Sequence, residues 1–196
     1  MGVVIKMIIL ILFDTDDLGL FSETKVQMGI TTPVLRKYEL IPLSVRNIPN
    51  RRRNSEIRKC IDKADLLAIA TGSYTFMRRW AHFAMVYGFI KNLPMMALSD
   101  VNMDTGWSRE IRPGPNPFNR VRWNIYNGTI RLYSLDSFLE VVWRLKATIP
   151  KQSVRYRLKG KEGYLDEIAP MYDWVLDDPN TNFPAWVRKS IWLAGL

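Results

Sequence analysis

Acidic residues cluster at two places in this sequence, and each cluster has the composition of a cation site. Asp14, Asp16 and Asp17 follow an apolar N-terminal run, and Asp177 and Asp178 lie near the C-terminus. Carboxylate oxygens hold hard cations such as Mg²⁺, so the first cluster is compatible with Mg-dependent phosphotransfer. Plainer explanations are favoured for both: a solvated loop that ends a buried strand, and a turn before Pro-Asn.

The single histidine and the single cysteine offer little for metal or covalent chemistry. One of each cannot build a zinc site of the usual kind, and one cysteine excludes an internal disulfide. Cys60 lies at helical spacing from Ile57 and Ile61, which favours a buried structural thiol over a nucleophile. For His82, a hydrogen-bonded position within a helix is favoured over a nucleotide contact. We expect no metal site, and we expect a reducing cytoplasm as the compartment.

The elements that must position these residues have the pattern of an α/β protein. Short apolar runs predict strands over residues 3–13, 39–43, 66–70, 95–98 and 130–133. Helical periodicity predicts helices over 55–63, 75–91 and 137–146. The clearest unit runs from the strand at 66–70 through the helix to the strand at 95–98, which is a right-handed βαβ crossover. It predicts a parallel sheet with helices on both faces.

The chain is expected to form one α/β domain over residues 1–150, with residues 151–196 as a helical extension packed on it. The Pro/Gly/Asn-rich stretch from 104 to 128 predicts a long loop, in which Trp107 and Trp123 would face solvent or a partner. The apolar start is too short to span a membrane and is interrupted by Lys6, so it predicts a buried strand and no membrane partner.

The charge balance is compatible with an anionic partner without identifying one. The net charge is +9 and the isoelectric point is near 9.8. The basic residues are spread along the chain, apart from the run at 51–53. Binding of nucleic acid would rest on charge alone, so we do not expect it.

Two segments are expected to meet at one edge of the sheet. In an open parallel sheet, ligands bind beyond the carboxyl ends of the strands, where the strand order reverses. Residues 13–17 follow the first predicted strand, and the TGSYT loop at 71–75 follows the third. Ser73 or Thr75 would cap the following helix, whose free backbone N–H groups favour a phosphate. Capping alone also explains these two residues.

Three motifs occur in a fixed order along the chain: ATGSYTFMRRW, GPNPFNR and YDWVLDDPNTNFPAWV. Together they resemble the TIR-like proteins of bacterial Thoeris antiphage defence, over about residues 54–186. The resemblance implies a flavodoxin-like α/β fold and NAD as substrate or ligand. It also implies cleavage of the nicotinamide–ribosyl bond to an ADP-ribose-type signal for an effector protein, and self-association of TIR-like domains.

This sequence differs from the family at the position of a residue that the resemblance implies to be catalytic. The family has a glutamate four residues after the tryptophan of the Arg-Arg-Trp motif, and here Trp80 is followed at that spacing by Ala84. A carboxylate would stabilise the oxocarbenium character that develops on the ribose. Loss of one such group lowers the rate by about a hundredfold to a thousandfold.

The first strand departs from the family pattern as well, since only Phe13 and Asp17 match it. The resemblance implies that the nucleotide is bound by Phe13, Asp17, Ser73, Arg79 and Trp80. We therefore expect a TIR-like defence protein acting on NAD, with turnover left open by Ala84. Two alternatives stay open: a non-catalytic TIR-like interaction module, and a Mg-dependent phosphotransfer domain using Asp14, Asp16 and Asp17.

Overall fold

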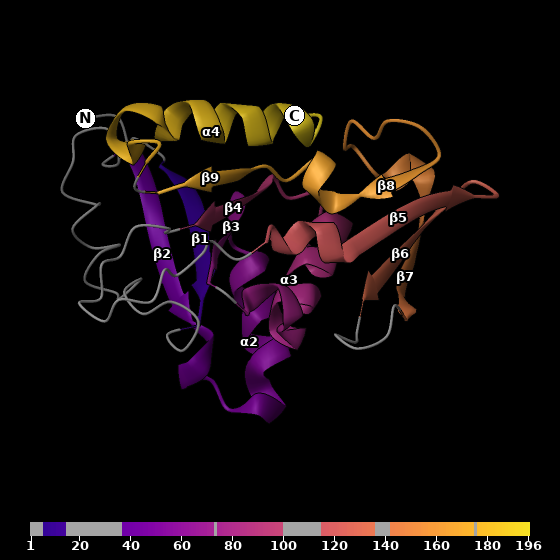
Figure 1. Cartoon of the computed structure of the whole chain (residues 1–196), viewed down its shortest axis with the longest axis horizontal. Helices are drawn as coiled ribbons and strands as arrows, with labels where there is room; N and C mark the ends of the chain where they lie inside the picture. Colours follow the sequence, from indigo (N-terminus) through magenta and orange to yellow (C-terminus); the bar gives the residue numbers. More distant parts are fainter. Residues whose placement is uncertain (1–5, 15–36, 73, 100–114, 136–141, 175) are drawn as a thin grey trace.

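The computed structural model describes residues 6–14, 37–72, 74–99, 115–135, 142–174 and 176–196. Its centre is a five-stranded parallel sheet in the order β2-β1-β3-β4-β9. The bounds are β1 Met7–Phe13, β2 Tyr38–Ser44, β3 Leu66–Thr71, β4 Met95–Ser99 and β9 Met171–Asp173. This order, with helices on both faces, is an α/β flavodoxin-like fold, as the sequence predicted (Figure 1).

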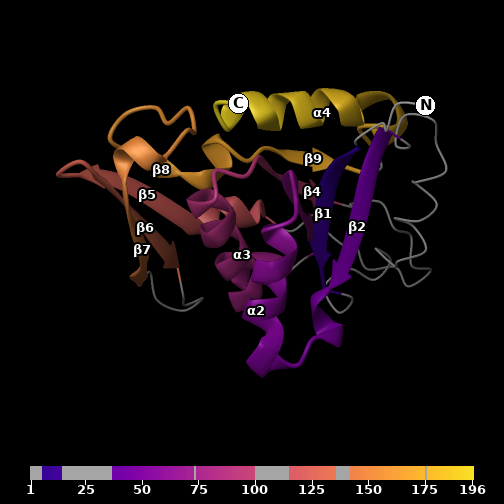
Figure 2. The same ribbon diagram turned by 180° about the vertical axis from the view of Figure 1, so that it is seen from behind.

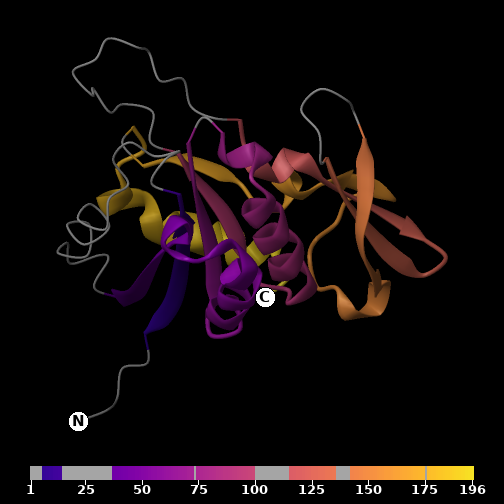
Figure 3. The same cartoon turned by 90° about the horizontal axis from the view of Figure 1, so that it is seen from below.

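Helices cover both faces of this sheet. Helices α2 (Asn50–Ile61) and α3 (Arg79–Ile90) lie on one face, and α4 (Pro179–Leu193) lies along the other (Figures 1 and 3). The strands are apolar on both sides because each face is covered, and every residue of β3 and β4 is buried. None of the described helices has the length and apolar character needed to cross a membrane.

A second sheet, which the sequence analysis did not predict, lies beside α3. It is antiparallel, in the order β7-β6-β5-β8 (Figure 2). Its bounds are β5 Val121–Tyr126, β6 Thr129–Leu135, β7 Trp143–Pro150 and β8 Glu162–Tyr164. Short 3-10 segments complete the description: Val45–Asn47, Thr75–Met77, Pro117–Arg120, Lys151–Ser153 and Leu165–Glu167.

Three predictions about this region were wrong. The expected helix over 137–146 falls partly outside the described residues, and Trp143–Pro150 form strand β7. The expected loop over 104–128 contains β5 in its described part. Trp123 does not face solvent but is fully buried, because alternate residues of β5 point into the core shared with α3.

Two apolar clusters lie on the two faces of the main sheet. One joins β1, β3 and β4 to α2, α3 and the second sheet, and it includes Leu12, Ala84 and Trp123. The other joins the opposite face of the same strands to α4 through Phe13 and Trp186. Residues after 150 therefore supply a strand and a helix of the main α/β layer, while the division of the chain at residue 150 stays a prediction.

Candidate functional site

Polar residues gather at the carboxyl edge of the main sheet, on the face that α3 covers. Leu10 and Leu12 of β1 pack in the cluster on that face, so Asp14 continues the same side of the strand. By the same alternation, Thr71 ends β3 and Ser99 ends β4 on that face, and the two are paired in register. All three are buried. Strand order reverses between β1 and β3, which is where such sheets bind ligands.

The hydroxyl groups at this edge are used in part by the fold itself. Thr71 Oγ1 donates a hydrogen bond to the Leu98 carbonyl at 3.3 Å, and Ser99 Oγ donates to the Tyr172 carbonyl at 3.3 Å. The backbone N–H of Gly72 donates to Thr75 Oγ1 at 2.9 Å. The first two hydrogen bonds join β3 to β4 and β4 to β9, and the third stabilises the turn that follows β3.

The start of α3 differs from the expected capping. The helix begins at Arg79 after a separate 3-10 turn, and its N-cap residue, Arg78, makes no side-chain capping bond. Thr75 accepts from Gly72 within the preceding turn instead of capping the helix, and Ser73 lies outside the described residues. The prediction that Ser73 or Thr75 is the N-cap of this helix was therefore wrong, because the N-cap residue is Arg78.

Trp80 and Ala84 lie one turn apart on the inward face of α3. Trp80 is 3% exposed and Ala84 is 0% exposed, and both pack in the cluster between α3 and the main sheet. The next turn carries Gly88, where an added Cβ would meet Met95 Sδ at 3.0 Å and Leu67 Cδ2 at 3.1 Å. Small residues let this face of α3 approach the strands closely, and Ala84 belongs to that contact.

Several buried polar atoms lack a hydrogen-bond partner among the described residues, and the indole nitrogens of Trp80 and Trp123 are two of them. Trp80 Nε1 is buried and has no hydrogen-bond partner among the described residues. A buried N–H without a partner costs about 1 to 3 kcal/mol, so it is rarely left without a reason. One such reason is a ligand that accepts the hydrogen bond.

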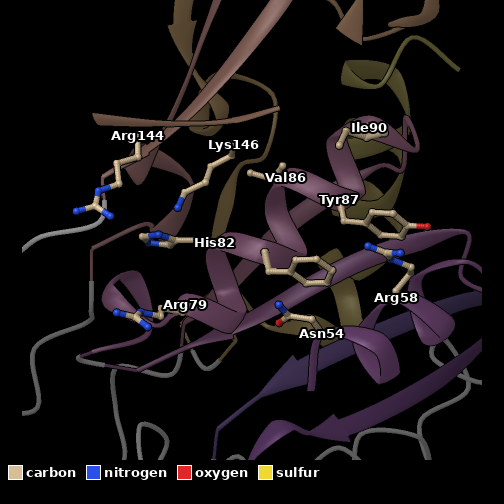
Figure 4. Close-up of a pocket in the computed structure, with 10 residues that line it drawn as sticks. Asn54, Arg58, Arg79, His82, Val86, Tyr87, Ile90, Arg144 and Lys146 are labelled. Carbon is tan, nitrogen blue, oxygen red and sulfur yellow. The ribbon is translucent and has the colours of Figure 1, made fainter. Parts of the chain in front are cut away.

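The expected nucleotide-binding residues are not all brought together. Phe13 packs in the cluster on the α4 face, whereas Trp80 packs on the α3 face. Arg79 is exposed and lines a cavity on the outer side of α3 (Figure 4). Asp17 lies outside the described residues, as does Ser73. Of the expected site residues that the structure describes, Trp80 and Ala84 are the two that share one face of α3 at the sheet.

His82 is a hydrogen-bonded helix histidine, as the sequence analysis favoured. Its Nε2 lies 2.8 Å from the Phe76 carbonyl oxygen, and its Nδ1 lies 2.8 Å from Ser134 Oγ of β6. The Nε2 contact joins α3 to the 3-10 turn before it, and the Nδ1 contact joins α3 to the second sheet. This arrangement favours a structural role.

Of the acidic residues considered for phosphotransfer, the structure describes Asp14, which is buried, and Asp177 and Asp178, which are used locally by the backbone. Asp177 Oδ2 accepts from the Asp173 backbone N–H at 2.8 Å, and Asp178 caps α4 by accepting from Asn180 N at 3.1 Å. This confirms that Asp177 and Asp178 belong to a turn. Within the described ranges, no three His, Cys, Asp or Glu residues are placed to hold a metal ion. Asp16, like Asp17, lies outside those ranges.

The remaining motifs of the resemblance stabilise the fold. In the GPNPFNR segment, Asn116 Oδ1 accepts from Phe118 N at 3.1 Å, and its side-chain amide donates to the Ala169 carbonyl at 3.4 Å. In the C-terminal motif, Tyr172 stacks on Trp186 with ring centroids 4.7 Å apart. Trp174 lies 5.7 Å from Phe183 in a T-shaped arrangement. These aromatic residues fix α4 on the sheet.

Tyr172 provides a test of this aromatic cluster by pH. Burial, with a smaller effect from the Asp177 carboxylate, raises the pKa of Tyr172 to about 12. Between the ordinary tyrosine pKa of about 10 and this value, the folded chain keeps a proton that the unfolded chain releases. The free energy of unfolding therefore falls as the pH rises above about 10.

We expect Tyr172→Phe to reduce this alkaline loss, measured by urea unfolding at several pH values. Near pH 7 the substitution should change stability little, because Tyr172 Oη is buried without a partner among the described residues. An unchanged pH profile would show that Tyr172 is not the titrating group.

The comparisons with known proteins add one relative. No family model matches the sequence. A protein of Bacillus cereus (strain MSX-D12) is 24% identical to this chain over 132 residues, which cover 65% of the chain and 68% of the relative. That relative is named as a candidate cyclic ADP-D-ribose synthase, ThsB1. The chain is thus distantly similar, over about two thirds of its length, to a protein named for the synthesis of cyclic ADP-ribose.

Proposed function

We propose that this chain is a TIR-like antiviral defence protein that binds NAD at the carboxyl edge of its parallel sheet. The observation that carries the proposal is the buried Trp80 Nε1, which has no hydrogen-bond partner among the described residues and belongs to the first turn of α3, the helix that follows β3. The polar residues Asp14, Thr71 and Ser99 are buried at the carboxyl edge of the same sheet. The flavodoxin-like strand order supports it, because ligands of such sheets bind at this edge. The similarity to a protein named as a candidate cyclic ADP-ribose synthase supports NAD as the dinucleotide.

Turnover is proposed to be slow. Cleavage of the nicotinamide–ribosyl bond places positive charge on the ribose, and a nearby carboxylate would stabilise that charge. Helix α3 carries Ala84 where the resemblance implies a glutamate, and Ala84 is fully buried. We therefore expect the chain to bind the dinucleotide and to release nicotinamide at least about a hundredfold more slowly than a relative with the acid.

Titration calorimetry with NAD and ADP-ribose tests binding at this edge. Wild-type protein should bind both, and Trp80→Phe should weaken binding about tenfold, because the variant keeps an aromatic ring but loses the N–H donor. Trp186→Phe is the matched control, since it makes the same change on the α4 face of the sheet. Its affinity should equal that of the wild type. Equal affinities for Trp80→Phe and Trp186→Phe, or no binding to the wild type, would contradict the proposal.

The interaction-module alternative predicts a different outcome of the same titration. A non-catalytic module that acts only through its surface would bind neither NAD nor ADP-ribose. It would instead self-associate or bind an effector protein, which sedimentation velocity of the purified chain would detect for self-association.

A further inference from the structure

Helix α4 is the outermost element on its face of the main sheet (Figures 1 and 2). Its inward side is apolar and packs on the strands through Phe183, Trp186 and Val187. Ser190 is fully buried, and Trp192, two residues later, lies on the opposite side because an α-helix turns by about 200° over two residues. Trp192 is 53% exposed. A large aromatic side chain is therefore presented to solvent near the end of α4.

Three basic residues lie near Trp192. Arg188 and Lys189 are exposed and lie one turn before it on α4. Arg157 comes from the segment after β7, and its guanidinium carbon lies 4.7 Å from the centroid of the Trp192 ring. The Arg157 Nε donates to the Trp192 carbonyl at 2.8 Å, and its backbone N–H donates to the Leu193 carbonyl at 3.0 Å. These contacts hold a cation from a distant part of the sequence against the end of α4.

A fourth cation, Arg155, lies at the same end of α4. A Cβ at Gly195 would collide with the Arg155 carbonyl oxygen, so the two backbones are in close contact there. None of the four cations is joined to an acid by an ion pair among the described residues, and residues 151–161 and 179–196 contain no aspartate or glutamate. Such uncompensated positive charge attracts an anionic partner. We use the name α4 surface for Trp192 together with Arg155, Arg157, Arg188 and Lys189.

The composition of the α4 surface favours an anionic bilayer over other anionic partners. Tryptophan side chains are enriched where membranes meet water, and clusters of Lys and Arg bind anionic lipid headgroups. Leu196, just beyond α4, is 55% exposed and adds apolar area, for which a nucleic-acid strand has no counterpart. Arg157 already covers one face of the Trp192 ring, which disfavours stacking of a base. None of these residues lines the cavity of Figure 4, and a bilayer, unlike a protein segment, needs no groove.

We propose that the α4 surface docks on a membrane surface that contains anionic lipids. The four cations would lie at the headgroup phosphates, and Trp192 would enter the interfacial layer. Each cation near such a surface strengthens binding by about fivefold. The expectation of no membrane partner rested on an N-terminal run that is too short to span, and docking on a surface needs no span. The inference does not depend on the function proposed for the carboxyl edge.

Co-sedimentation of the full chain with lipid vesicles tests the α4 surface. Vesicles of phosphatidylcholine with about one third phosphatidylserine should be bound at least about tenfold more tightly than vesicles of phosphatidylcholine alone, and high salt should remove the difference. Arg188→Ala/Lys189→Ala should weaken binding to the mixed vesicles by at least about tenfold. The charge-matched control Arg51→Ala/Arg52→Ala removes two exposed cations from α2, on the opposite face of the sheet. Its affinity should stay within about twofold of wild type.

The aromatic part of the surface has a matched control as well. Trp192→Ala should weaken binding to the mixed vesicles by at least about threefold, because the indole no longer enters the interfacial layer. Tyr126 is 52% exposed and has the Arg131 guanidinium carbon 4.5 Å from its ring centroid, but it belongs to the second sheet. The affinity of Tyr126→Ala should therefore equal that of the wild type.

Two kinds of result would overturn the proposal. One is equal binding to the two kinds of vesicle, or equal weakening by the two double variants. The other is tighter binding of a single-stranded oligonucleotide, or of polyglutamate, with the same dependence on Arg188 and Lys189. That result would favour a nucleic-acid partner or an acidic protein partner, respectively.

Discussion

Replacing Ala84 by glutamate is expected to lower the free energy of unfolding by about 3 kcal/mol or more at pH 7. Ala84 is fully buried between α3 and the main sheet, and one turn later an added Cβ at Gly88 would lie 3.0 Å from Met95 Sδ. A glutamate there adds volume to a packed interface and places a carboxylate in an apolar environment. Urea unfolding followed by circular dichroism measures the loss.

Ala84→Gln separates the two causes of that loss. Glutamine has nearly the same shape as glutamate but does not ionise, so it carries the steric cost alone. Burial raises the pKa of a carboxyl group, so the folded Ala84→Glu chain would hold a proton above the unfolded value of about 4.3. Its stability relative to Ala84→Gln should therefore fall as the pH rises from about 4 to 7. Equal stabilities of the two variants across this range would show that position 84 is accessible to water.

Replacing Trp123 by alanine is expected to destabilise the chain by about 3 to 5 kcal/mol. Trp123 is fully buried in the cluster that joins the second sheet to α3 and the main sheet. Its indole nitrogen has no partner among the described residues, so the side chain contributes mainly through its apolar contacts. Chemical unfolding of Trp123→Ala and wild type measures the difference.

Trp123→Phe is the milder control, with an expected loss of about 1 to 2 kcal/mol. It keeps an aromatic ring and removes the unpartnered N–H, which offsets part of the lost volume. If both variants lost less than 1 kcal/mol, the second sheet would contribute little to the shared core.

Four of the five strands of the main sheet could be predicted from the sequence, because they are short apolar runs between helical segments. Strand β9 was not predicted, because its three residues lie in the segment expected to be helical. Strands β3 and β4 match the apolar runs at 66–70 and 95–98, because a strand covered on both faces must be apolar throughout. The predicted helix between them is α3. The first apolar run likewise contains β1. The strand begins at Met7, directly after the exposed Lys6.

The second sheet had a signal that the sequence analysis overlooked. Residues 121–135 alternate apolar and polar side chains on either side of Asn127-Gly128. Both of these residues have positive φ, 47° and 71°, as a tight hairpin between β5 and β6 requires. The polar, Pro-rich stretch before it led to the prediction of one long loop. The described part of the expected helix, residues 143–146, belongs instead to β7, which is stabilised by pairing with β6.

The candidate sites were predicted only in part, for a physical reason. Trp80 and Ala84 could be placed together from the sequence, because residues four apart lie on the same face of a helix. The structure also places Arg58 of α2 and Arg144 and Lys146 of β7 around one cavity, and such an arrangement of distant segments follows from tertiary packing, which the sequence alone did not reveal. Phe13 was placed with Trp80 by motif alone, while the strand alternation turns it toward α4.

Nicotinamide release from NAD, compared among wild type, Ala84→Glu and Ala84→Gln, tests most directly the claim that α3 borders an NAD site that lacks its acid. We expect folded Ala84→Glu to release nicotinamide at least about tenfold faster than the other two proteins. One positioned, ionised carboxylate accounts for about a hundredfold, and both strain and the raised pKa of the buried group remove part of that gain. Ala84→Gln should match wild type. If Ala84→Glu, folded and binding ADP-ribose, released nicotinamide no faster than Ala84→Gln, the claim would be contradicted.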